Sequence, residues 1–283
     1  MKKRILSVLL AAIIVLAIVP FSAITAFADT PEAEISEVST FGELLEAVNS
    51  DKEHIKLTKD IEDVVPDDEL PTKHRLVFDG GKNYLFDLNG YTLKVINHAN
   101  EYYTGKVPMI SVSGTSTLEI KGGSLGFDNW YAGNDRKARG VVHVADTSTL
   151  VATKVNMQNK YAGNVVSATA DAHVTLDGGE YTVQNGFAIY LDRQASLTLD
   201  GDVSIQTVVG DSANTQYGNG YGALYSESTG ELIVNYAFFK SGIQVSKSQI
   251  GAFSTANHEV TINGKVLTED IFVGTSTEAK NQN

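Results

Sequence analysis

Apolar residues recur along this chain at two fixed offsets that stay the same from one repeat to the next. Six anchors follow one another at separations of 25, 32, 24, 23 and 35 residues: Leu93, Leu118, Leu150, Val174, Leu197 and Leu232. Another apolar residue lies eight positions before each anchor, in the order Leu85, Ile110, Val142, Val166, Ile189 and Leu224. A third lies two positions after, in the order Val95, Ile120, Ala152, Leu176, Leu199 and Val234. This constant register predicts stacked coils of strands whose equivalent residues lie ~4.8 Å apart and form a continuous core.

Glycine and aspartate recur soon after the anchors, where they permit the positive φ angles of tight turns. These sites are Gly122-Gly123, Asp177-Gly178-Gly179 and Asp200-Gly201-Asp202. A β-sandwich also combines many short strands with such turns and is the alternative fold. The fixed offsets favour the coils, and the longer separations then correspond to coils that carry loop insertions.

The N-terminal end of the solenoid has a predicted cap. Thr40 and Glu43 have the spacing of a capping box, and Leu44, Leu45 and Val48 share one face of the helix that would follow. Such an amphipathic helix is expected to cover the first coil, since a solenoid otherwise exposes unpaired strand edges at its ends. A strand is expected directly after it, over residues 54–57.

The far end is expected to close with a β-hairpin over residues 260–266, because Asn263-Gly264 is a typical hairpin turn. The predicted organisation is therefore a signal peptide at 1–28, an N-terminal segment with the capping helix at 29–66, the parallel β-helix at 67–266 and a polar C-terminal tail at 267–283. The expected fold class is all-β.

The first 28 residues have the three parts of a secretory signal. Lys2, Lys3 and Arg4 precede the apolar run of residues 5–20, and Ala26-Phe27-Ala28 supplies a cleavage site before Asp29. An uncleaved membrane anchor is the alternative, but the run is short for a membrane span. Removal of three basic residues changes the net charge from −12 to −15. The predicted localisation is extracellular or at the cell surface, with no membrane insertion after signal removal.

Composition excludes several classes of function. The chain has no cysteine, which excludes a disulfide scaffold and a thiol nucleophile, and favours a bacterial source for an exported protein. The 34 acidic residues exceed the 22 basic ones, which argues against a nucleic-acid partner.

Four segments give the chain a resemblance to the secreted right-handed parallel β-helix proteins of the pectate-lyase-like superfold. They are HIKLTKDI (54–61), LFDLNGYTL (85–93), STLEIKGGSL (116–125) and ASLTLDGDVSI (195–205). The resemblance implies a protein that cleaves or binds polysaccharides, or a surface protein without catalysis. It matches no enzyme subfamily, because the aspartate cluster with Gly-His-Gly of polygalacturonases and the arginine and calcium motifs of pectate lyases are missing. Fold alone does not choose among these functions.

Two long insertions, at residues 126–140 and 208–222, are expected to leave the solenoid at the same corner, about three coils or ~14 Å apart. Both are rich in aromatic and polar residues that suit sugar rings and hydroxyls. The predicted ligand-binding residues there are Trp130, Tyr131, Arg136, Arg139, Tyr217 and Tyr221. Alternatively, these aromatic side chains only pack over the flank of the solenoid and bind no ligand.

The first strand of each coil adds an outward row beside this corner. If Val142 and its equivalents point inward, the next residues point outward and form one exposed row: Ser111, His143, Ser167, Tyr190 and Tyr225. Of these, His143, Tyr190 and Tyr225 are assigned to ligand binding. Two positions further on, Asp192 and Glu227 are expected to lie on adjacent coils, ~5 Å apart at the backbone.

Three roles remain open for this carboxylate pair. Asp192 and Glu227 have a separation that suits the acid and the nucleophile or base of glycoside cleavage. They also suit a calcium ion, although no other cofactor or metal is expected. Solvated side chains, one of them paired with Arg193, are the third possibility.

The leading hypothesis is a secreted β-helix protein that binds polysaccharide or glycan on its looped flank without catalysis. The first alternative is a polysaccharide lyase or glycoside hydrolase, in which Arg136 or Arg139 neutralises a substrate carboxylate and Asp192 or Glu227 transfers protons. The second is a structural or adhesive cell-surface module that binds a protein partner. The sequence leaves the question of catalysis open.

Overall fold

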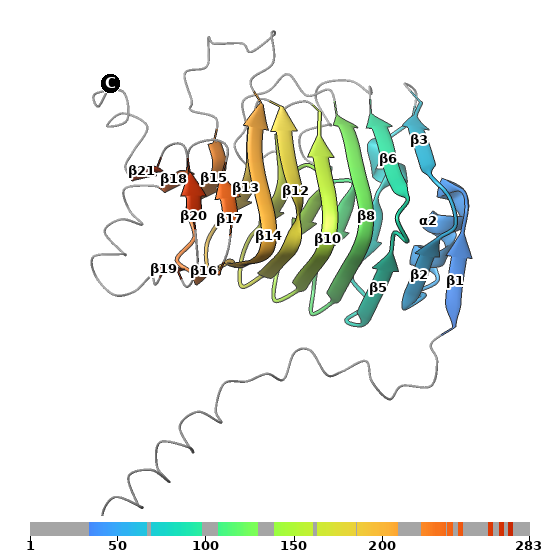
Figure 1. Ribbon diagram of the computed structural model, residues 1–283. Coiled ribbons are helices and arrows are strands. Elements are labelled where there is room, and N and C mark those ends of the chain that lie inside the picture. Colours follow the sequence, from blue (N-terminus) through green and yellow to red (C-terminus); the bar gives the residue numbers. More distant parts are fainter. Residues whose placement is uncertain are drawn as a thin grey trace, which may run out of the picture. The chain divides into compact units, whose positions relative to one another are not determined.

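Two parallel β-sheets form the structured part of the chain in the computed structural model (Figure 1). The structure describes residues 34–66, 69–97, 107–129, 139–160, 163–184, 186–208, 222–235, 237–239, 243–245, 260–262, 266–268 and 271–273. Sheet A contains β1 (Ile35–Val38), β2 (His54–Leu57), β3 (Ile61–Val65), β5 (Asn83–Asp87), β6 (Thr92–Asn97), β8 (Thr117–Asn129), β10 (Thr149–Asn159), β12 (His173–Gln184), β14 (Ser196–Val208), β16 (Leu232–Val234), β17 (Ala237–Phe239), β19 (Val260–Ile262) and β20 (Val266–Thr268). Sheet B contains β4 (Leu76–Phe78), β7 (Ile110–Val112), β9 (Val142–Val144), β11 (Gly163–Ala168), β13 (Gly186–Leu191), β15 (Gly222–Ser226), β18 (Ile243–Val245) and β21 (Ile271–Val273).

Sheet A has two arms, because β8 and β14, at the two ends of the row of long strands β8, β10, β12 and β14, each pair with two different short strands along their two halves. β5 pairs with the first half of β8, and β6 pairs with the second half. The chain thus passes from a strand of sheet B into the first arm, then into the second arm, and back to sheet B. Every pairing between described strands is parallel, and this arrangement is compatible with a β-helix-like solenoid.

The apolar register predicted from the sequence is confirmed from the second anchor onward. Leu118 pairs with Leu150, and the same column continues through Val174, Leu197 and Leu232. All five side chains are buried. In sheet B the matching column is Ile110, Val142, Val166, Ile189 and Leu224, which is also buried. Stacked equivalent residues therefore form the core, as expected for parallel strands at ~4.8 Å spacing.

The first anchor was wrong. Tyr84, rather than Leu93, pairs with Leu118, and Leu93 pairs with Leu125 in the second arm. A turn at Asn89, which has a φ of 52°, separates β5 from β6 and moves Leu93 to the other arm. Val95 leaves its predicted column for the same reason, and Leu85 pairs with Glu119 in the first arm instead of lying in the column of Ile110.

The recurring glycines mark the corner between the two arms. Gly122, Gly178 and Gly201 have φ angles of 56°, 72° and 60°, in the left-handed region that glycine adopts without strain. The sequence identified these positions as turns, and the structure confirms them as corners within β8, β12 and β14, whereas in β10 Lys154 has the positive φ, 53°.

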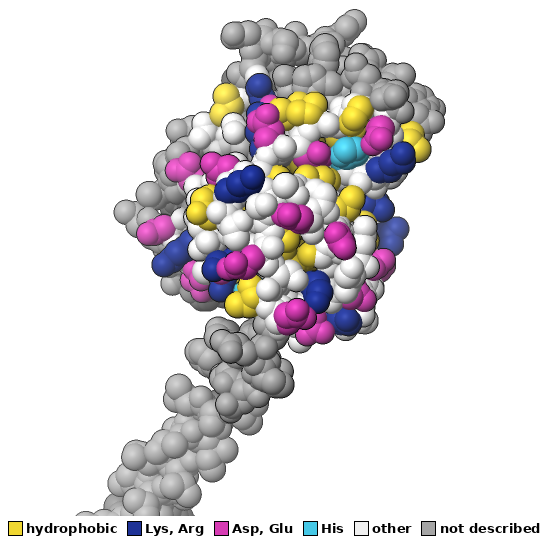
Figure 2. Space-filling model, turned by 90° about the vertical axis from the view of Figure 1, so that its right-hand side faces the viewer, with side chains coloured by type: hydrophobic (Ala, Val, Ile, Leu, Met, Phe, Trp, Pro, Cys, Tyr) yellow, Lys and Arg dark blue, Asp and Glu magenta, His cyan; other side chains and the backbone are white. Residues whose placement is uncertain are grey.

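A capped helix lies next to the first strands. Thr40 Oγ1 accepts a hydrogen bond from Glu43 N at 3.2 Å, and Thr40 N donates to the Glu43 carboxylate at 3.1 Å, so the predicted capping box is present at α2 (Phe41–Asn49). Leu44 and Val48 are buried against the sheets. Figure 2 shows basic and acidic side chains intermixed on this end of the molecule, as a terminal cap requires. A short 3-10 helix, η1 (Pro71–His74), follows later in the chain.

The predicted C-terminal hairpin was wrong. β19 pairs in parallel with β16, and β20 pairs in parallel with β17, so the two strands extend two different arms. The connection at 263–265 lies outside the described residues. Two short apolar strands joined by Asn-Gly can pair with each other as a hairpin or can each extend a different arm of the sheet. Here β19 extends the arm of β16, and β20 extends the arm of β17. β21 then adds to sheet B, and β2 and β3 already belong to sheet A.

The predicted signal peptide at 1–28 lies outside the described residues. Within the part of the chain that the structure describes, no helix has the length and hydropathy of a membrane-spanning segment.

Candidate functional site

The outward row of sheet B has the predicted register but not the predicted exposure. His143, Ser167, Tyr190 and Tyr225 pair in sequence on adjacent strands, which confirms the column. All four are buried, with exposed fractions of 6% or less. The expectation of an exposed row was therefore wrong. Strand alternation gives the direction in which a side chain points but not whether other groups cover it.

Aromatic packing is one physical reason for this burial. Tyr225 packs between Phe187, at a ring-centroid distance of 4.8 Å, and Tyr190, at 5.8 Å. These three side chains form a separate small apolar cluster on the outer side of sheet B. A ligand does not have free access to the faces of these rings, so their predicted role as a sugar platform does not follow from their position.

Glu227 is fixed by the two tyrosines. Tyr190 Oη donates to one carboxylate oxygen at 3.0 Å, and Tyr225 Oη donates to the other at 2.8 Å. Burial raises the pKa of Tyr190, and the nearby negative charge of Glu227 raises it further. The hydroxyl therefore remains a proton donor to the carboxylate at neutral pH.

The predicted stacking of Asp192 on Glu227 agrees with the strand register. Leu191 pairs with Ser226, and Glu227 N donates to Leu191 O. Asp192 Oδ1 accepts a hydrogen bond from the backbone N of Arg193 at 2.8 Å. These contacts occupy both Glu227 oxygens and one oxygen of Asp192. Their assignment to proton transfer or to calcium binding stays a prediction. Among the described residues, no group of three or more acidic or histidine side chains is placed to hold a metal ion.

The predicted insertions lie at the C-terminal ends of β8 and β14, which belong to the same sheet and are separated by β10 and β12. β8 continues to Asn129, so Gly126 and Asp128 belong to the strand and not to the insertion. The predicted binding residues Trp130, Tyr131, Arg136, Tyr217 and Tyr221 lie outside the described residues. Arg139 is described and is half-buried.

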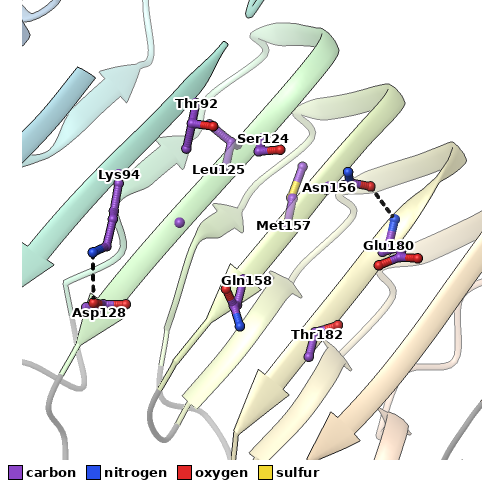
Figure 3. Close-up of a pocket in the computed structure, with 11 residues that line it drawn as sticks. Thr92, Lys94, Ser124, Leu125, Asp128, Asn156, Met157, Gln158, Glu180 and Thr182 are labelled. Atoms are coloured by element: carbon purple, nitrogen blue, oxygen red, sulfur yellow. Dashed lines mark hydrogen bonds and ion pairs between the residues drawn. The ribbon is translucent and has the colours of Figure 1, made fainter. Parts of the chain in front are cut away.

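An open groove crosses the outer face of the second arm, where the sequence analysis placed no site (Figure 3). Its volume is about 290 Å³. Outward side chains of β6, β8, β10 and β12 line it in two columns, and the buried Leu125 and Met157 lie beneath them. One column is Thr92, Ser124, Asn156 and Glu180, and the other is Lys94, Gly126, Gln158 and Thr182. Strand alternation presents every second residue to this face.

Gly126 accounts for the hollow in the second column. It pairs with Lys94 on one side and with Gln158 on the other, and it contributes no side chain between them. A Cβ at this position would lie 3.3 Å from Cγ of Lys94. The missing side chain therefore opens a space between a cation and an amide on the two strands that flank β8.

Charges lie at one margin of the groove. Lys94 Nζ is 3.2 Å from Asp128 Oδ2 and 3.4 Å from Glu62 Oε2, and Lys160 Nζ approaches Asp128 Oδ2 to 3.7 Å. Partial burial lowers the pKa of Lys94, but the contacts with Asp128 and Glu62 outweigh it and raise the pKa above its ordinary value. Lys94 is therefore a fixed cation at neutral pH.

Apart from the Glu180 carboxylate, neutral hydrogen-bonding groups line the remaining groove. The Asn156 side-chain oxygen accepts from Glu180 N at 3.0 Å, which leaves the amide nitrogen directed away from that contact. Hydroxyl and amide groups both donate and accept hydrogen bonds, so they match the hydroxyls of a sugar without requiring a charge. A period-two series of Ser, Thr, Asn and Gln in consecutive second-arm strands was the sequence signal for this surface. The aromatic residues of the two insertions suggested a binding site on the looped flank instead.

Comparison with protein-family models, with curated proteins and with solved structures finds no match for this chain.

Proposed function

We propose that this chain is a secreted right-handed parallel β-helix protein that binds a neutral polysaccharide or glycan in the groove of the second arm, without cleaving it. The observation that supports this proposal is the open groove of about 290 Å³, lined by hydroxyl and amide side chains from four adjacent strands. The proposal keeps the class of ligand expected from the sequence and moves its site from the loops of the flank to a face of sheet A.

Regular spacing makes this face suitable for a repeating ligand. Strands ~4.8 Å apart place the groove residues of β6 and β12 ~14 Å from each other, a length that accommodates several sugar rings. One column has a polar side chain on every strand, so an extended ligand can meet a hydrogen-bonding group at each step: Thr92, Ser124, Asn156 and Glu180. Gly126 interrupts the column of side chains and gives a sugar ring room to approach the sheet.

Binding is favoured over cleavage by the state of the acidic groups in the groove. Glycoside hydrolysis uses two carboxyl groups on opposite sides of the scissile bond, one of them able to donate a proton. The groove contains Asp128 and Glu180, and Asp128 is ion-paired with Lys94 and Lys160. Both lysines approach Oδ2 of Asp128, so this carboxylate is engaged in ion pairs at the margin of the groove.

A Gly126→Gln variant tests the site directly. The new side chain resembles its neighbour Gln158, and the flexible Lys94 side chain is the first atom group that must move. We expect the wild-type chain to bind neutral polysaccharides on a glycan array and Gly126→Gln to lose most of that binding. Thr198→Gln, which adds the same amide to an outward position of the first arm, is the matched control and should bind normally.

Loss of binding in Gly126→Gln but not in Thr198→Gln, with unchanged thermal unfolding of both, supports the groove. Absence of binding to every neutral glycan by the wild type contradicts the proposal. Release of reducing ends or unsaturated products from a bound glycan would show instead that the protein is an enzyme.

A further inference from the structure

Two arginines and a histidine lie close together on the outer side of sheet B, near its β4 end. Arg75 directly precedes β4, whose Leu76 N donates to Met109 O next to β7. β7 pairs in turn with β9, which contains His143. Arg139 lies four residues before His143, and burial together with the positive charge of Arg139 lowers the pKa of His143. Three strands thus bring the two guanidinium groups and the imidazole to one region.

This region contains buried polar atoms that have no partner. His143 is 6% exposed, and its Nδ1 lies 2.9 Å from Ser167 Oγ. Its other ring nitrogen, Nε2, is buried without a hydrogen bond, and so is Nε of Arg75. Buried polar atoms in folded proteins are nearly always hydrogen-bonded, so two orphans at one place need an explanation.

The charges in the same region are unbalanced. Among the described residues, no carboxylate forms an ion pair with Arg75 or Arg139. Burial lowers the pKa of Arg139, and the positive charge of Arg75 lowers it further. Asp146 acts on His143 from a distance, but it is exposed and accepts a hydrogen bond from Gly114 N. Within the part of the chain that the structure describes, these two neighbouring cations therefore have no carboxylate partner.

His143 adds a neutral donor to these cations. Burial and the charge of Arg139 lower the pKa of His143 to about 4, so its imidazole is uncharged at neutral pH. When Ser167 Oγ donates to Nδ1, the ring proton lies on Nε2, which is the buried nitrogen without a partner. In that tautomer the region presents hydrogen-bond donors only, namely one imidazole N–H and two guanidinium groups.

We infer that Arg75, Arg139 and His143 form a binding site for an oxyanion group, either a carboxylate or a tetrahedral sulfate or phosphate. A bound oxyanion accepts hydrogen bonds from Nε of Arg75 and Nε2 of His143 and supplies the missing negative charge. The planar fork of an arginine matches the paired oxygens of such groups, and charge-assisted hydrogen bonds are among the strongest in proteins. A metal cation would instead be repelled by both guanidinium groups. This site is on a different sheet from the glycan groove and does not depend on it.

Anion-dependent stability tests this inference on the full chain. Sodium sulfate, sodium phosphate and sodium acetate are added separately to the wild type, with sodium chloride at equal ionic strength as the reference, and unfolding by urea is measured. We expect at least one oxyanion to stabilise the wild type more than chloride does, and calorimetry to show saturable binding. Binding of sulfate or phosphate alone identifies a tetrahedral ligand, whereas binding of acetate identifies a carboxylate.

Charge-neutralising variants supply the decisive comparison. Arg75→Gln and Arg139→Gln should each raise the dissociation constant of the anion by roughly tenfold or more. Without an oxyanion, they should unfold at the same or a higher urea concentration than the wild type, because removal of one cation relieves repulsion. Arg193→Gln, which removes the same charge from an exposed turn, should leave anion binding unchanged. Gly126→Gln should also leave it unchanged, which separates this site from the groove.

Two results would overturn the inference. One is a wild type that none of the three oxyanions stabilises beyond chloride. The other is equal anion binding by the wild type and by Arg139→Gln. Should an arginine variant fail to fold, calorimetry of the wild type with each anion still decides the first of these outcomes.

Discussion

Tyr190 and Tyr225 stack with their ring centroids 5.8 Å apart and their planes inclined by 11°, and both donate a hydrogen bond to Glu227. The strand register explains this arrangement, because the two tyrosines are paired residues on β13 and β15. Parallel stacking repeats each side chain above its equivalent, so two identical aromatic residues overlap and present their hydroxyls to a common acceptor.

Tyr190→Phe is expected to lower the free energy of unfolding by about 1.5–3 kcal/mol, the usual contribution of a hydrogen bond to a charged group. The phenylalanine keeps the ring stack and removes only the hydroxyl that binds Glu227. Urea denaturation at pH 7 measures the change. In combination with Glu227→Gln the two losses should be less than additive, since they remove the same interaction. Full additivity would show that Tyr190 and Glu227 act independently.

Gly179 is expected to be the least replaceable corner glycine. Its φ is 104°, and a Cβ there would collide with the carbonyl group of Val155 on the adjacent strand. We expect Gly179→Ala to destabilise the fold by several kcal/mol, through both backbone strain and steric overlap. Gly122→Ala is the matched control, because Gly122 also has a positive φ, 56°, but no atom within 4 Å of the added Cβ. Gly122→Ala should lower the free energy of unfolding by only about 1 kcal/mol.

Equal losses of stability in the two glycine variants, measured by thermal unfolding, would contradict this account. Such a result would mean that the φ angle alone, and not the approach of the neighbouring strand, determines which corner requires glycine.

The inner columns could be predicted from the sequence because only one arrangement buries the same positions in every repeat. Leu118, Leu150 and Leu197 share a register that an apolar pattern specifies directly. The first coil departs from it because a turn at Asn89 shifts Leu93 into the next arm, and a shift of this kind leaves the alternation of apolar residues intact.

The outward surfaces could not be predicted in the same way. Alternation shows that Tyr190 and Gln158 point away from the core, yet the first is buried and the second is exposed. This difference depends on which groups lie over each sheet, and no period in the sequence records it. The groove at Gly126 was missed because it results from a missing side chain between its two neighbours in space, Lys94 and Gln158.

The capping box of α2 gives a third prediction. Thr40→Ala removes the side chain that accepts from Glu43 N, and we expect a loss of about 1 kcal/mol in the free energy of unfolding. Thr40→Ser keeps an acceptor oxygen at the same position and should lose much less. Chemical denaturation of both variants measures the difference. Equal losses would indicate that the methyl group of Thr40, and not its hydroxyl, stabilises the helix.

His74 should make the stability of the protein depend on pH. Its Nδ1 is 2.7 Å from Asp63 Oδ2 and its Nε2 is 2.9 Å from Glu69 Oε2, and its ring stacks on Phe41. Burial lowers the pKa of His74, but the hydrogen bonds to Glu69 and Asp63 outweigh it, so the folded pKa lies above its ordinary value of 6.5. The glutamate responds in the opposite sense, since its contact with the imidazole lowers the pKa of Glu69.

A raised folded pKa means that the native state binds the proton more tightly than the unfolded chain does. The stabilisation from His74 is therefore complete below the unfolded pKa and is lost as the pH rises through the folded pKa. We expect His74→Gln to be clearly less stable than the wild type at about pH 5.5 and closer to it at about pH 9. Urea unfolding at the two pH values measures both differences. A penalty of the same size at both would show that His74 acts through packing on Phe41 and not through its charge.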